Sequence, residues 1–152
     1  MPRGALIAVL VAAPTLAAAQ TSDGWSFAHW GMSQTQVRAV FAGRAHPPTD
    51  DPDSPDDVVD GGATIDRFQF AVRLEYAAAG LVQIDLRLHG TAADCAALGD
   101  HLKATYGPNW SEADNDAFVT LTWAGARDGN AVAWTREGDG MDACEIELTP
   151  PG

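Results

Sequence analysis

The chain has little positive charge. Its 152 residues include 9 Lys and Arg against 21 Asp and Glu, a formal net charge of −12 at neutral pH. Nucleic acids and anionic membranes are bound by clustered Lys and Arg, so we expect neither as a partner. The acidic surface favours solubility, and binding of a cationic ligand or partner is the alternative use of this charge.

The sequence also lacks the motifs that carry enzymatic chemistry. It contains no G-x-S-x-G, H-E-x-x-H, P-loop or G-x-G-x-x-G segment. Its four histidines, at positions 29, 46, 89 and 101, do not have the spacing of paired metal ligands. We therefore predict a protein that is not an enzyme and that holds no cofactor or metal.

No hydrophobic run is long enough to cross a membrane. The apolar stretch at residues 5–13 follows Arg3 and precedes Ala17-Ala18-Ala19, a small-residue cleavage site. This pattern predicts a signal peptide at residues 1–19, cleaved before Gln20, and a periplasmic or secreted protein. A lipid anchor would need a cysteine at the cleavage point, so we predict a single unanchored domain over residues 20–152.

Only two cysteines are present, Cys95 and Cys144. An even number in an exported chain favours a disulfide. Because the two positions are 49 residues apart, the bridge should stabilise the fold by about 4 kcal/mol through loop closure. The wide spacing indicates a structural bridge and not a redox pair.

Two segments have the pattern of helices. Ser33 and Gln36 form a capping box at the start of residues 32–41, where Val37, Val40 and Phe41 should share one face. Thr91 and Asp94 begin a second helix that runs to about Tyr106. Its inward side is predicted to carry Cys95, Leu98, Leu102 and Tyr106.

Alternating residues predict the strands. The segments 68–76 and 82–89 should pair as a hairpin with Tyr76 opposite Val82 and Leu74 opposite Ile84. This register places Arg73 opposite Asp85 on the solvent face, where we expect an ion pair. Three further strands are predicted at residues 119–123, 132–134 and 144–148, with a turn at Asp128-Gly129 that pairs Trp123 with Trp134.

Residues 46–62 contain four prolines and six of the aspartates, with little apolar surface to bury. We predict a mobile acidic loop, with calcium binding as the alternative reading of its carboxylates. Together these elements predict an α+β fold, in which an antiparallel sheet of about five or six strands carries two helices packed on one face.

Two short motifs carry a resemblance to known proteins. Trp30-Gly31-Met32-Ser33 and the later Tyr106-Gly107-Pro108 resemble a group of short exported bacterial proteins without assigned function. The segment Gly31–Val37 resembles the helix start of BamE/SmpA-like envelope proteins. That resemblance implies a small α+β fold and an accessory role in outer-membrane protein assembly, although the anchor cysteine of that family is missing here.

We therefore expect a non-enzymatic interaction module of the bacterial envelope that binds another protein. Exposed aromatic and charged side chains are the candidates for contact: Trp110, Arg73, Glu75, Asp85 and Arg87, with Glu145 and Glu147 on the same sheet face. The alternative is an inhibitor of an extracellular or periplasmic enzyme, which would insert residues 107–116 or 125–130 into an active site. A second alternative, a small hydrolase or ligand-binding enzyme, requires a deep pocket with converging polar groups.

Overall fold

A computed structural model describes residues 28–108, 110–115, 117–124, 130–137 and 144–151. The predicted signal peptide and the Asp128-Gly129 turn lie outside the described residues. Among the helices that are described, none has the length and apolar character needed to cross a membrane.

The described chain is mostly β, with 46% of it in strands and 20% in helices. The helices are α1 (Gln34–Val40) and α2 (Ala92–Tyr106). The strands are β1 (Ala45–His46), β2 (Asp57–Val59), β3 (Ala63–Ile65), β4 (Phe68–Ala77), β5 (Gly80–Leu88), β6 (Ser111–Asp114), β7 (Phe118–Trp123), β8 (Ala131–Glu137) and β9 (Cys144–Thr149). The predicted α+β sandwich of five or six strands is therefore wrong, because the prediction missed the short strands β1, β2, β3 and β6.

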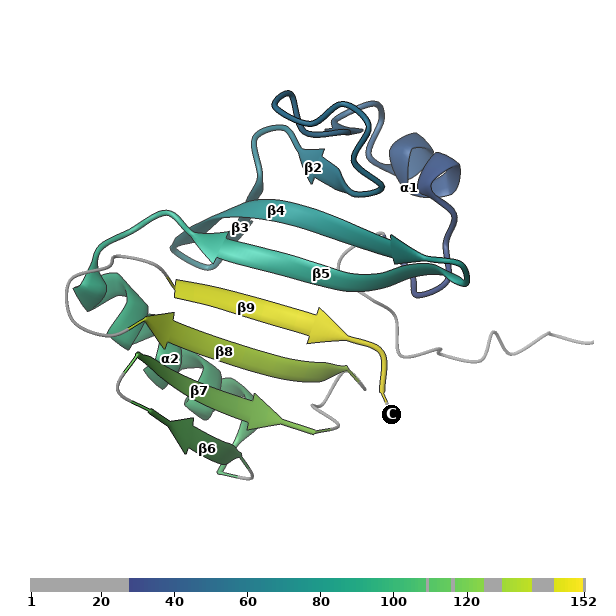
Figure 1. Ribbon diagram of the computed structural model, residues 1–152. Helices are drawn as coiled ribbons and strands as arrows, with labels where there is room; N and C mark the ends of the chain where they lie inside the picture. The colour runs from purple at the N-terminus through teal and green to yellow at the C-terminus, as the bar shows by residue number, and fades with distance from the viewer. Residues whose placement is uncertain (1–27, 109, 116, 125–129, 138–143, 152) are drawn as a thin grey trace, which may run out of the picture.

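The nine strands of the described residues form one antiparallel sheet in the order β1-β2-β4-β5-β9-β8-β7-β6. The short strand β3 pairs with β4, which also pairs with β2. After β5 the chain passes through α2 to β6 at the far edge (Figure 1). It then returns through β7 and β8 until β9 pairs with β5. We call this β5–β9 pairing the seam, because it joins the two halves of the sheet.

The predicted register of β4 and β5 is confirmed over most of its length. Leu74 lies opposite Ile84, and Arg73 lies opposite Asp85. A β-bulge between Glu75 and Tyr76 then places Tyr76 opposite Leu81, where Val82 was predicted. The alternation of side chains could not reveal this bulge, because one extra residue near a turn leaves the preceding pattern intact.

The second predicted register is wrong by two residues. Trp123 pairs with Val132, and Trp134 pairs with Leu121, so the pairing is centred one residue before Asp128-Gly129. A shift of two residues leaves every side chain on its predicted face. Both tryptophans therefore remain buried, and the Nε1 of Trp123 donates to the carbonyl oxygen of Gly107 at 3.1 Å.

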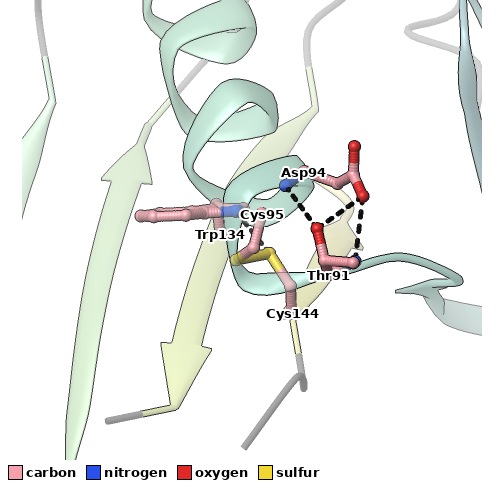
Figure 2. Close-up of a disulfide and its surroundings, with 5 residues drawn as sticks. All are labelled: Thr91, Asp94, Cys95, Trp134 and Cys144. Atoms are coloured by element: carbon pink, nitrogen blue, oxygen red, sulfur yellow. Dashed lines mark hydrogen bonds between the residues drawn. A yellow bond between two sulfur atoms is a disulfide. The ribbon is translucent and has the colours of Figure 1, made fainter. Parts of the chain in front are cut away.

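Helix α2 is fixed to the sheet near its beginning (Figure 2). The predicted capping box is present, since Thr91 and Asp94 bond each other's backbone N–H groups. The predicted disulfide joins Cys95 to Cys144 at the start of β9. One turn further on, a Cβ added at Gly99 would lie 3.0 Å from the Trp134 ring, so a glycine allows α2 to approach β8 closely.

Helix α1 lies near the opposite edge, beside β2 (Figure 1). Its capping box of Ser33 and Gln36 is confirmed. Val37 and Phe41 are buried as predicted, but Val40 is 43% exposed. The prediction for Val40 is wrong because Val37 is the only buried residue of this seven-residue helix, and Phe41, four residues later at the C-cap, continues the same face while Val40 turns away from it.

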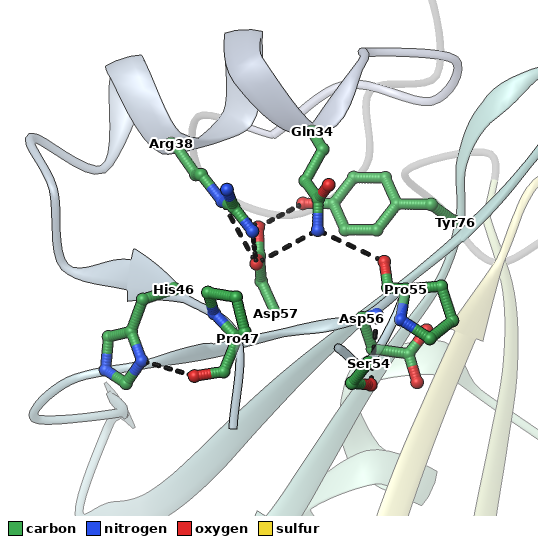
Figure 3. Close-up of polar contacts among 9 residues, drawn as sticks. All are labelled: Gln34, Arg38, His46, Pro47, Ser54, Pro55, Asp56, Asp57 and Tyr76. Atoms are coloured by element: carbon green, nitrogen blue, oxygen red, sulfur yellow. Dashed lines mark hydrogen bonds and ion pairs between the residues drawn. The ribbon is translucent and has the colours of Figure 1, made fainter. Parts of the chain in front are cut away.

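The acidic segment 46–62 is structured at its end, which corrects the prediction of a loop throughout. Asp57 in β2 is fully buried and accepts hydrogen bonds from three side chains (Figure 3). Its partners are Arg38 with the closest contact at 2.6 Å, Gln34 at 3.2 Å and the Tyr76 hydroxyl at 3.2 Å. This carboxylate connects α1, β2 and β4.

Replacing both cysteines by serine should lower the free energy of unfolding by about 4 kcal/mol, since the unfolded chain regains the entropy of a 49-residue loop. Urea unfolding of the variant and of the oxidised wild type measures the difference. Equal midpoints for the two proteins would contradict a stabilising bridge.

Asp57→Ala should cost about 3 kcal/mol, because it leaves Arg38, Gln34 and Tyr76 without their common acceptor. The matched control is Asp53→Ala, an exposed position in the same segment, which should change stability by less than about 0.5 kcal/mol. Denaturant midpoints compare the two. Similar losses for both variants would show that the Asp57 network does not hold α1.

Candidate interaction surface

The sheet has one face turned away from the helices, which we call the open face. Alternation along β4, β5 and β9 places charged side chains there. Asp85 lies in one row with Arg73 and Glu147, and Arg87 lies in the next row with Glu145. The structure thus brings together four predicted binding residues: Arg73, Glu75, Asp85 and Arg87.

These residues line a shallow hollow of about 350 Å³. Its remaining wall consists of Val58, Ala71, Val72 and Glu145. Among the described residues, the polar groups that line it are the carboxylates of Glu75, Asp85 and Glu145 and the guanidinium groups of Arg73 and Arg87, so the hollow offers charge, hydrogen-bond acceptors and hydrogen-bond donors. Among the described residues, no group of three or more His, Cys, Asp and Glu is placed to hold a metal ion.

Arg73 makes a different ion pair from the one predicted. Its Nη2 lies 2.6 Å from Oδ2 of Asp56, and its Nε lies 3.8 Å from Oε1 of Glu75. The predicted partner Asp85 is opposite in register but has no ion pair of this kind with Arg73. Asp56 was missed because it belongs to an aspartate run expected to face solvent.

Asp85 is crowded by other carboxylates. Only 8% of this residue is exposed, and Gln83 donates to Oδ1 at 2.9 Å. Burial raises the pKa of Asp85, and the charges of Glu145 and Glu147 raise it further. The pKa of Glu75 is also raised, first by burial and then by the charge of Asp85. Both acids are therefore harder to ionise here than in water.

Negative charge is in excess over this part of the open face. Five carboxylates lie there, from Asp56, Glu75, Asp85, Glu145 and Glu147, beside two guanidinium groups. One of these, Arg73, is already engaged by Asp56. We call these seven side chains the acidic half of the open face.

The other half of the open face carries small side chains. Ala133 pairs with Thr122, and Thr135 pairs with Thr120, whose hydroxyl lies 3.1 Å from that of Thr135. All four side chains are partly exposed. Because short side chains leave a flat β-surface, this half can approach another surface closely.

Trp110 lies apart from the other predicted binding residues. Its ring is 6.2 Å from that of Trp123, and the Nζ of Lys103 is 5.4 Å from its ring centroid. The side chain is partly buried and packs against the core, as large rings at the end of a small sheet commonly do. Of the segments predicted for an inhibitor, residues 107–116 contain the edge strand β6, and residues 125–129 lie outside the described residues.

Comparisons with family models, curated proteins and solved structures find no match to this chain. The resemblance to BamE/SmpA-like proteins therefore stays a prediction from the short motifs.

Asp85→Asn should raise the stability of the protein at neutral pH. Because the pKa of Asp85 is raised in the folded state, the folded wild type is relatively most stable while Asp85 is protonated. It loses stability relative to the unfolded chain as the pH rises through the raised pKa. The gain from asparagine should therefore be absent in acid and grow toward neutrality. Because the hydrogen bond from Gln83 offsets part of the cost of ionising Asp85, we expect about 1 kcal/mol or less.

Thermal unfolding at a series of pH values measures this effect. The matched control is Asp114→Asn on the exposed edge strand β6, which should give little change at any pH. A loss of stability in Asp85→Asn at neutral pH would show that the Asp85 charge is favourable in the free protein.

Proposed function

We propose that this protein is a non-enzymatic interaction module that binds another protein through its open face. The observation that carries the proposal is the placement of Glu145 and Glu147 on the strand beside the nearly buried Asp85, where burial and then these two charges raise its pKa. Like charges on one sheet face destabilise the free protein. A neutral side chain would avoid that cost, so we infer that the charges serve binding.

The partner should present Lys or Arg to the acidic half. A cationic side chain placed among these carboxylates would relieve their mutual repulsion and favour the ionised forms. The flat half with Ala133 and Thr135 supplies the adjoining close contact. Complementary charge of this kind raises association rates and selects among partners.

We also propose that the protein acts outside the cytoplasm. The disulfide between Cys95 and Cys144 is typical of oxidising compartments. The predicted signal peptide supports the same location, in the periplasm or beyond the cell.

A photo-crosslinking residue at Ala133 on the open face should capture a specific partner from the periplasmic and secreted fractions of the source cells. The matched control places the same residue at Ala96, which is exposed on α2. Capture through Ala133 alone supports the proposal. Equal capture from both positions would contradict it.

Charge variants then test the role of the acidic half. Glu145→Gln with Glu147→Gln should weaken capture and reduce its sensitivity to salt, because both carboxylates lie beside the proposed contact. Glu112→Gln with Asp114→Asn removes the same charge from β6 and should leave capture unchanged. If the two pairs behave alike, only the net charge of the protein matters and the site is wrong.

A further inference from the structure

A small apolar cavity lies between α2 and the sheet, on the side of the seam opposite the open face. Its volume is about 110 Å³. Seven of its lining side chains are apolar, from β3, β4, β5, α2 and β9: Ile65, Phe70, Leu86, Leu98, Leu102, Ile146 and Leu148. We call it the α2 cavity.

The attachment of α2 explains why this space stays open. The disulfide at Cys95 and the close approach of Gly99 to Trp134 hold the helix toward β8 and β9. Its other side faces β4 and β5, where the apolar side chains of Phe70 and Leu86 form the floor. On the side of β3 and β4, α2 makes lighter contacts, through His101 with Asp66 and with the Phe68 ring.

Among the described residues, the polar side chains that line the cavity all come from α2: His101, Thr105 and Tyr106. The Nε2 of His101 lies 3.2 Å from Oδ2 of Asp66 in the β3–β4 turn, and 33% and 67% of these two side chains are exposed. The Thr105 hydroxyl donates to the His101 carbonyl oxygen at 2.8 Å. These exposed polar groups lie at the edge of the cavity beside the β3–β4 turn, where the hydroxyl of a bound ligand would meet them.

We propose that the α2 cavity binds a small molecule of the phenol class, with one six-membered ring inside and one hydroxyl near the polar side chains. A cavity of roughly 150 Å³ lined by Leu, Ile and Phe stays dry and binds benzene. The α2 cavity is somewhat smaller but open on one side, so a single ring fits with its polar end outward. No buried side-chain polar atom among the described residues lacks a partner, so nothing in the apolar interior calls for a second polar group on the ligand.

Titration of the full folded protein with phenol, followed through the methyl NMR signals of leucine and isoleucine, tests this inference. We expect saturable shifts confined to the residues that line the cavity. Shifts that do not saturate, or that map to other parts of the molecule, would overturn the proposal. The readout is independent of the open face, so its failure would leave the proposed function untouched.

Variants provide the matched comparison. Leu98→Phe fills the cavity and should abolish the shifts. Leu121→Phe adds the same bulk beside a separate surface hollow near Trp134 and should preserve them. Equal effects of the two variants would contradict the assignment.

A second variant keeps the test valid if Leu98→Phe does not fold. Leu102→Ala enlarges the same cavity and should tighten the binding of a larger ring, such as naphthol, relative to wild type. Unchanged affinity for naphthol would overturn the proposal.

Discussion

The pairing of β5 with β9 holds the sheet together. These strands are separated by α2 and three other strands in the sequence, yet four residue pairs join them, from Ile84 with Leu148 to Arg87 with Glu145. Without this seam the chain would form two smaller sheets, each with an additional edge. The disulfide is placed to secure it, because Cys95 lies near the start of the helix that follows β5 and Cys144 begins β9.

The seam has opposite chemistry on its two faces. On the helix side Leu86 meets Ile146, and both belong to the lining of the α2 cavity. On the open side Asp85 meets Glu147, and Arg87 meets Glu145. Because neighbouring residues of a strand point to opposite faces, one register determines both features. A slip of a single residue would bring the carboxylates into the core and expose the apolar residues, so burial of Leu86 and Ile146 also sets the crowding around Asp85.

Strong alternation in the sequence was enough to predict the central elements and part of the candidate surface. The β4–β5 register follows from matching Leu74 with Ile84, and it places Arg73, Glu75, Asp85 and Arg87 on one face. The long helix α2 could be predicted from its capping box and from the apolar residues along its inward side. Cys95 belongs to that side, which agrees with its disulfide to Cys144. In each case enough residues repeat the same pattern for the periodicity to be read without the fold.

The missed features depend on long-range contacts. Strands of two to four residues, such as β1, β3 and β6, carry too little pattern to be recognised and form because a longer strand offers them an edge. The partners of Asp56 and Asp57 were missed for a related reason. A run of aspartates indicates solvent exposure on average, whereas Arg73 and Arg38 reach these two from other parts of the chain.

The two most deeply buried carboxylates of the sheet show how structural and functional charges can be distinguished. Asp57 is surrounded by donors from Arg38, Gln34 and Tyr76, which compensate its burial within the protein itself. Asp85 receives a hydrogen bond from Gln83 but faces the charges of Glu145 and Glu147. We therefore assign the Asp57 charge a structural role. The Asp85 carboxylate, whose ionisation its neighbours oppose, lies on the open face, where a cationic partner would supply the missing positive charge. For this reason we propose the interaction surface around Asp85 and not around Asp57, whose charge is compensated within the protein.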